Sequence, residues 1–133
     1  MKSDEQLCGE LREATRGLLF MSESDYPFEV VRWEGLEAVS PEHLRGVSGQ
    51  GATAPVEERT IADFFRVAAG EPEWKDEAQR LVARRYQQLA RLLEANLAEV
   101  KVYRVGAINI GVYVVGRSKE GSWLGLSTRV VET

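Results

Sequence analysis

The sequence predicts an α+β fold in which helices pack against a mainly antiparallel four-stranded sheet. Apolar residues recur at helical spacing in the N-terminal two thirds, whereas the C-terminal third is rich in β-branched residues and divided by glycines. The chain has 133 residues, of which 44% are hydrophobic, and it shows no internal repeat, linker or low-complexity tract. We therefore expect a single domain covering residues 1–133.

The N-terminal segment carries the signals of a capped helix. Ser3-Asp4-Glu5-Gln6 has the spacing of a capping box, and apolar residues follow at helical intervals. A helix is therefore expected over about residues 4 to 16, with Gly17 as its stop. A polar loop comes next at Ser22 to Asp25. Residues 28–33 are β-branched and aromatic and are bounded by proline and glycine, which predicts a strand.

Two short capped helices are expected in the middle of the chain. Ser40-Pro41-Glu42 combines an N-cap with proline at the first helical position, which predicts a short helix through Leu44. Residues 46–55 are rich in glycine and other helix breakers and are expected to form an irregular surface loop. Thr60 then caps a second short helix over residues 61–65.

The longest helix is expected to follow the acidic segment Glu71-Pro72-Glu73, with Trp74 at its opening. Its predicted apolar stripe comprises Ala78, Leu81, Val82, Tyr86, Leu89, Leu93 and Leu97. Three antiparallel strands are expected at residues 100–105, 108–115 and 123–131. Residues 119–122 have hairpin-turn composition, and Gly106-Ala107 is either a tight turn or a bulge.

Charge and cysteine content narrow the classes of function. With 17 basic and 21 acidic residues, the formal net charge of −4 argues against nucleic-acid binding through phosphate neutralisation. The single cysteine, Cys8, excludes an internal disulfide and a thiolate metal site. No signal-peptide pattern and no apolar run of membrane-spanning length are present, so we expect a cytoplasmic protein without a membrane or direct nucleic-acid partner.

Catalytic machinery is not evident among the residue types. His43 is the only histidine, and a surface or cap-supporting role suits it better than general base catalysis. The glycine-rich residues 46–51 lack the preceding strand and following helix of a phosphate-binding loop. Cys8 lies in an amphipathic segment, where a buried apolar side chain is expected. The residue types favour binding over catalysis.

Binding requires only exposed groups that are held in place, and three places in the chain meet this description. Glu23 stands in the polar loop between apolar neighbours. Trp74 is surrounded by charged residues and is either a cap of the core or an exposed interface anchor. The last residues, Val130 to Thr133, continue a strand, so we expect the terminal carboxylate to be held.

Several segments taken together resemble the nuclease A inhibitor family. They are MSESDYPFE within residues 17–30, Ala54-Pro55-Val56-Glu57, Tyr86-Gln87, KVYRVG at 101–106, VYVVG at 112–116 and the VVET ending. The resemblance runs in order from about Leu7 to Thr133. It implies a three-layer α-β-α sandwich, similar in architecture to plant pathogenesis-related proteins of class one.

The resemblance also implies a function. Family members inhibit a sugar-non-specific, Mg-dependent endonuclease of the ββα-metal type, made by cyanobacteria. The protein is then expected to be no enzyme, to need no cofactor and to be a monomer when alone. Its partner is expected to be the nuclease itself.

Three contact positions carry over from the family to this chain. The glutamate of the MSES segment matches Glu23, the tryptophan opening the long helix matches Trp74, and the C-terminal threonine matches Thr133. In the family these residues enter or border the nuclease active site, and the threonine is linked to the metal that the nuclease binds. Carboxylates placed there mimic phosphate beside Mg²⁺.

Departures from the family pattern leave other functions open. Gly111 stands where the family usually has an acidic residue, and the loops around residues 36–55 and 66–72 match only loosely. A small-ligand-binding module that uses a pocket of the sandwich is the main alternative. A hydrolase that uses carboxylates and a metal is a further one.

Overall fold

The structure is a computed structural model that describes residues 1–132 as an α+β fold. In chain order its elements are α1 (Asp4–Ala14), β1 (Leu19–Met21), β2 (Asp25–Pro27), β3 (Glu29–Trp33), α2 (Pro41–Ser48), β4 (Val56–Arg59), α3 (Ile61–Ala69), α4 (Glu77–Asn96), β5 (Ala98–Val105), β6 (Asn109–Arg117) and β7 (Trp123–Val131). One sheet has the strand order β3-β7-β6-β5-β4, and β1 and β2 pair separately. All of these pairings are antiparallel. The α+β expectation is confirmed, but a four-stranded sheet is wrong, because β4 adds a fifth strand.

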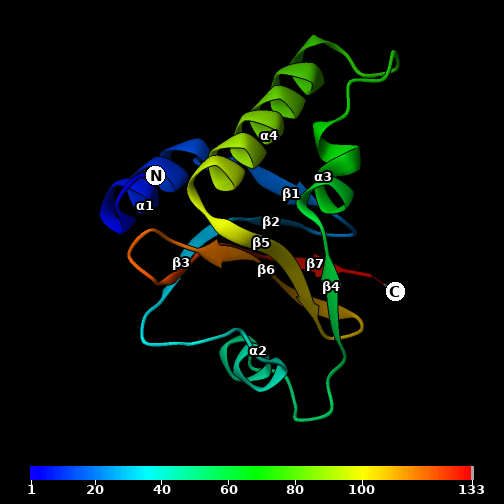
Figure 1. Ribbon diagram of the computed structural model, residues 1–133. Coiled ribbons are helices and arrows are strands. Elements are labelled where there is room, and N and C mark those ends of the chain that lie inside the picture. Colours follow the sequence, from blue (N-terminus) through cyan, green and yellow to red (C-terminus); the bar gives the residue numbers. More distant parts are fainter. Residues whose placement is uncertain (133) are drawn as a thin grey trace.

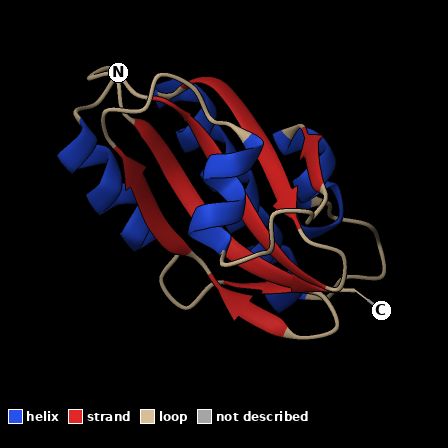
Figure 2. Cartoon of the chain, turned by 90° about the horizontal axis from the view of Figure 1, so that it is seen from below, coloured by secondary structure: helices blue, strands red, loops and turns tan. Residues whose placement is uncertain are grey.

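Helices cover both faces of the five-stranded sheet. α1, α3 and α4 lie on one face, and α2 lies on the other, as Figures 1 and 2 show from two directions. Because side chains alternate along a strand, each central strand supplies two cores. Val112 and Val114 of β6 pack in one core with Leu89 of α4. Tyr113, between them, packs in the other core with Leu44 of α2. The layer order agrees with a sandwich, and the similarity to pathogenesis-related proteins stays a prediction.

Side-chain caps set the helix starts. The capping residues are Ser3 for α1, Ser40 for α2, Thr60 for α3 and Asp76 for α4. The starts predicted for the first three helices are confirmed. α2 and α3 are longer than expected, and residues 46–48, predicted as loop, belong to α2. That helix ends at Gly49, which adopts a left-handed conformation with φ of 71°.

The long helix begins later than the sequence suggested. Asp76 and Gln79 form a capping box, so Trp74 lies in the turn before α4 and does not open the helix. The first turns of α4 extend past the sheet (Figure 1). Leu81 and Val82, predicted as part of the buried stripe, are therefore exposed, whereas Tyr86 is buried. None of the helices within residues 1–132 is long and apolar enough to cross a membrane.

The last three strands, β5, β6 and β7, are antiparallel, as predicted. Gly106 has a φ of 113°, and a Cβ at this position would lie 2.7 Å from the carbonyl oxygen of Asn109, so Gly106 forms a tight turn and not a bulge. The hairpin turn between β6 and β7 is also confirmed, with Gly121 at a φ of 88°. The irregularity lies instead in β5, where the register with β6 shifts between Ala98 and Lys101.

Candidate functional site

The polar loop folds as the turn of a short β-hairpin. Met21 of β1 pairs with Asp25 of β2, which leaves Ser22-Glu23-Ser24 as the turn between them. At its base the hairpin is joined to the large sheet, because the hydroxyl of Thr128 donates to the carbonyl oxygen of Pro27 at 3.0 Å. We call Ser22-Glu23-Ser24 the acidic turn. Sequence reasoning missed both strands, since each has only three residues and one contains proline.

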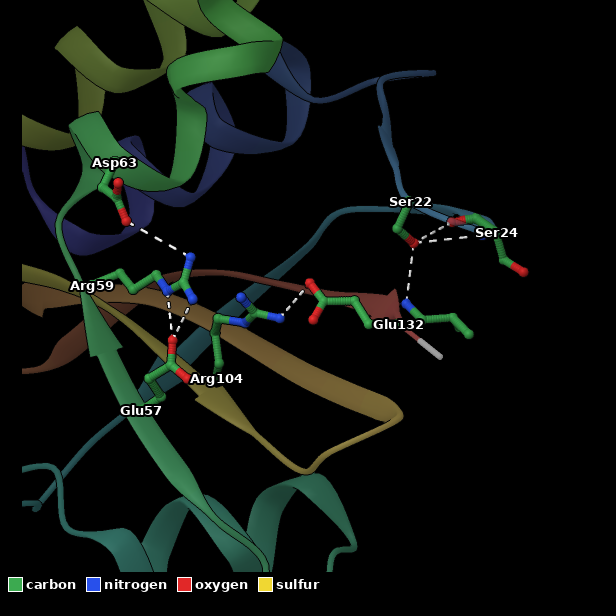
Figure 3. Close-up of polar contacts among 8 residues, drawn as sticks. Ser22, Ser24, Glu57, Arg59, Asp63, Arg104 and Glu132 are labelled. Atoms are coloured by element: carbon green, nitrogen blue, oxygen red, sulfur yellow. Dashed lines mark hydrogen bonds and ion pairs between the residues drawn. The ribbon is translucent and has the colours of Figure 1, made fainter.

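Ser22 fixes the shape of the acidic turn and attaches it to β7. Its hydroxyl donates to the carbonyl oxygen of Ser24 at 2.8 Å and accepts from the N–H of Val131 at 3.1 Å (Figure 3). The N–H of Glu23 donates to the carbonyl oxygen of Val131 at 3.4 Å. Glu23 is exposed. Its carboxylate is therefore displayed by a turn whose backbone is held at the end of β7.

The chain itself is held beside the acidic turn up to Glu132. The N–H of Glu132 donates to the carbonyl oxygen of Ile108 at 3.0 Å. Its carboxylate pairs with the guanidinium of Arg104 at 2.6 Å, and the Arg104 side chain is only 10% exposed (Figure 3). Thr133, the third candidate residue, lies outside the described residues. The acidic turn and the last strand thus meet at one end of the sheet.

Further ion pairs connect α3 and β4 to this end of the sheet. Arg59 of β4 pairs with Glu57 at 2.5 Å and with Asp63 of α3 at 3.7 Å (Figure 3). The hydrogen bond that the Arg59 guanidinium donates to Glu57 is the main cause that raises the pKa of Arg59. Glu57 also stands opposite Arg104 in the register of β4 and β5. Acidic and basic side chains therefore alternate from α3 across β4 and β5 to Glu132, and their pairing stabilises the packing of these elements.

Trp74 lies in the turn between α3 and α4, and its side chain is 70% exposed. A role in capping the core is therefore wrong, and the alternative of an exposed side chain is confirmed. Lys75 holds this turn against α3: its ammonium donates to the carbonyl oxygens of Val67 at 3.0 Å and Gly70 at 2.8 Å. The same ammonium lies 5.7 Å from the centre of the Trp74 ring. Trp74 is thus exposed on a turn that is held in place.

Trp74 and the β1 hairpin border one apolar groove of about 400 Å³, between β1, α3 and the start of α4. Its exposed apolar side chains, which are 43% to 76% exposed, are Leu19, Met21, Val67, Trp74 and Val82. We call this surface the apolar groove. Its inner side includes Phe20 and Phe64, whose rings stack with centres 4.5 Å apart. Met21 lies two residues before Glu23, so the β1 hairpin connects the apolar groove, which Trp74 borders, to the acidic turn.

A second cavity, of about 370 Å³, lies on the α2 face of the sheet. Trp33, Tyr113 and Arg129 are among the residues that line it. Gly111 lets α2 approach this face, since a Cβ at this position would lie 3.2 Å from the Cβ of Ser48. Burial raises the pKa of Tyr113. Gly111 thus lies on the face opposite the apolar groove.

His43 and Cys8, the other two residues considered in the sequence, both pack against neighbouring side chains. Burial lowers the pKa of His43, and its ring packs edge-on against Trp33 with centres 4.5 Å apart. Cys8 is buried in the core of the α1 face, as expected, and burial raises the pKa of its thiol. Within residues 1–132, no group of three or more His, Cys, Asp or Glu side chains is arranged to hold a metal ion.

A family model described as nuclease A inhibitor-like protein matches residues 5–133. No curated protein matches the chain significantly. The family match spans the β1 hairpin, the turn before α4 and the end of β7, so it includes each element that builds the site described above.

Proposed function

The chain belongs to the nuclease A inhibitor-like family, and we propose that it inhibits a sugar-non-specific, Mg-dependent endonuclease by occupying its active site. The family match is the observation that carries this proposal. The proposed partner is a ββα-metal nuclease of the cyanobacterial type. The inhibitor itself is proposed to be a monomer and to be cytoplasmic. It assigns the inhibitor no catalysis and no cofactor of its own.

Glu23 is proposed to take the place of substrate phosphate. A nuclease cleft of this class holds phosphate next to Mg²⁺ and cationic side chains, so a carboxylate placed there makes charge-assisted contacts. Such contacts are strongest when the carboxylate needs little ordering on binding. The Ser22 hydroxyl supports this role, because it donates to Ser24 and accepts from Val131 and so orders the acidic turn in the inhibitor alone.

Thr133 is proposed to reach the divalent metal that the nuclease holds. Support comes from its neighbour, since Glu132 is held by both Arg104 and the carbonyl of Ile108. A residue that follows a fixed neighbour has a restricted set of positions. The hydrogen bond from Glu23 to Val131 brings the acidic turn next to the same strand end. Glu23 and Thr133 are therefore proposed to enter the cleft together, with Trp74 adding apolar contact at its border.

The test is a titration of a Mg-dependent, sugar-non-specific ββα-metal nuclease from the same host, followed by DNA cleavage. The wild-type protein is expected to abolish activity at one-to-one stoichiometry. Glu23→Ala, Trp74→Ala and deletion of Thr133 are each expected to weaken inhibition by more than roughly 1 kcal/mol. Glu5→Ala, which removes an exposed carboxylate from α1, is the matched control. Full nuclease activity at large inhibitor excess would contradict the function, and unchanged inhibition by all three variants would contradict the site.

Small-ligand binding is the second candidate function, and the cavity on the α2 face is the observation that favours it. Aromatic walls from Trp33 and Tyr113 with a charged rim at Arg129 are typical of small-molecule sites. Native mass spectrometry of the protein purified from its host tests this candidate. A bound compound of constant mass that is lost in Gly111→Leu, which would place a side chain against Ser48, is the expected result. Protein that carries no adduct in repeated preparations, together with stoichiometric nuclease inhibition, would contradict it.

A further inference from the structure

We propose that the apolar groove receives an apolar side chain of the nuclease, one that lies on the rim of the cationic, metal-binding cleft. This inference rests on the proposed inhibitory function and adds the chemistry of a second contact. It assigns roles to Leu19, Met21, Val67 and Val82, which nothing in the sequence marked as functional.

The first argument is the concentration of exposed apolar side chains at the groove. Charged residues make up 29% of the chain, yet five large apolar side chains with exposed fractions of 43% or more line this one surface. Scattered exposed apolar residues are ordinary, but a contiguous group indicates a binding surface. Covering this group would remove apolar area from water, which favours association.

The second argument is that the side chains of Lys75, Gln79 and Tyr86, which border the groove, already make hydrogen bonds within the protein. The Lys75 ammonium donates to carbonyl oxygens at the end of α3. The Gln79 side chain accepts from the N–H of Asp76 in the capping box. The Tyr86 hydroxyl donates to the carbonyl oxygen of Leu19 at 2.5 Å. A polar occupant would lose its hydrogen bonds to water with little replacement, so the groove selects an apolar one.

The third argument is that the groove walls are held in position. The hydroxyl of Tyr86 on α4 holds β1, and the Phe20 ring of β1 stacks on Phe64 of α3. Lys75 holds the turn that carries Trp74. All three sides are therefore connected to one another before any partner binds. A preformed groove needs little ordering on binding, which raises affinity.

The fourth argument identifies the occupant through its neighbours. β1 lines the groove and leads directly into Glu23, and Asp25 follows on the other arm of the hairpin. Asp25 is exposed and makes no ion pair within residues 1–132. When a partner covers the groove, the adjoining part of its surface therefore faces the carboxylates of Glu23 and Asp25. An apolar side chain beside a cationic, metal-binding cleft would fill the groove and also face these carboxylates. A free apolar molecule would only fill the groove.

The test compares inhibition constants for two double variants in the nuclease titration. Met21→Ala with Val67→Ala removes apolar area from the groove. Leu81→Ala with Val47→Ala removes apolar side chains that are 56% and 44% exposed and lie outside the groove. All four residues are exposed, so both proteins are expected to stay folded, which urea unfolding checks. The groove variant is expected to weaken inhibition at least about tenfold and the control less than about twofold.

Each other outcome is decisive. Equal inhibition constants for the two double variants would overturn the groove inference. The proposed function would still stand in that case, provided that the wild-type protein inhibits the nuclease. Failure of the wild-type protein to inhibit would overturn both. Sedimentation analysis covers a different occupant: if the wild-type protein were a dimer in solution and the groove variant a monomer, a second copy of this chain would be the occupant and the inference would be wrong.

Discussion

At the scale of single residues, Ser22 is expected to affect inhibition by positioning Glu23. Ser22→Ala removes the hydroxyl that bonds to both Ser24 and Val131. The acidic turn then has more conformations to lose on binding, so inhibition is expected to weaken by roughly 0.5 to 1.5 kcal/mol. Ser24→Ala is the matched control, because Ser24 takes part in these bonds only through its backbone. Inhibition constants measure both, and equal values for the two variants would refute the positioning role.

Tyr86 gives a prediction about alkaline pH. Burial is the main cause that raises its pKa, because the phenolate is disfavoured away from water. The neutral form is therefore favoured in the folded state, and its contribution to stability is complete below the ordinary tyrosine pKa of about 10. That contribution is lost as pH rises from there toward the folded-state value. Burial raises the pKa of Tyr103 and Tyr113 too, so the loss has several sources.

Urea unfolding between pH 8 and pH 11 measures this effect. The free energy of unfolding of the wild-type protein is expected to fall above about pH 10, and Tyr86→Phe is expected to show a smaller fall. At pH 8 the variant is expected to be less stable by roughly 1 to 3 kcal/mol, since the Leu19 carbonyl oxygen loses its donor. Parallel pH profiles of the two proteins would rule out the contribution of Tyr86 to the alkaline loss.

At the scale of elements, the turn between α3 and α4 depends on one ammonium group. Lys75→Met keeps an aliphatic stem but removes the donor to the carbonyl oxygens of Val67 and Gly70. We expect a loss of stability of roughly 0.5 to 1.5 kcal/mol and weaker inhibition, because the turn that carries Trp74 loosens. Lys119→Met, in the exposed turn between β6 and β7, is the control. Reduced stability with unchanged inhibition would show that Lys75 only caps α3.

The same elements show how far sequence reasoning reaches. Capped starts such as Ser40 and Thr60 were predictable, because a cap needs only residues a few positions apart. β1, β2 and β4 were missed, since strands of three or four residues at edges carry little periodic signal. The capping box of Asp76 and Gln79 can be recognised in the sequence, but the acidic segment before it favoured an earlier start for α4. The exposure of Val82 depends on how far α4 extends past the sheet, which no local pattern contains.

For the candidate site, sequence reasoning reached the exposed residues and missed what positions them. Glu23 was identified from its polar setting and from the family resemblance, and its exposure is confirmed. The attachment of its turn to Val131 joins residues 109 positions apart, and the ion pair of Arg104 with Glu132 is similarly non-local. The apolar groove likewise combines three separate segments. Such contacts follow from the tertiary fold and leave no local trace in the sequence.

At the scale of the whole molecule, the sheet separates two cores that are expected to have different consequences for function. Leu44 is the buried anchor of α2 in the smaller core, whereas Phe65 lies in the larger core against Phe64 and Tyr86, beneath the apolar groove. Leu44→Ala is expected to cost about 2 to 5 kcal/mol of stability through the cavity it leaves. Because the groove lies on the other face and the acidic turn is held at the end of the sheet by Val131, inhibition by the folded protein is expected to be unchanged.

Phe65→Leu is the matched comparison, because it also disturbs a buried side chain but does so under the site. It is expected to weaken inhibition even where the protein is fully folded, since Phe64 and Phe20 lose a packed neighbour. Urea unfolding gives the folded fraction of each variant, and the titration is run at a temperature where that fraction is close to one. If Leu44→Ala weakened inhibition as much as Phe65→Leu, the two layers would be coupled through the sheet, and the α2 face would have to be counted as part of the inhibitory site.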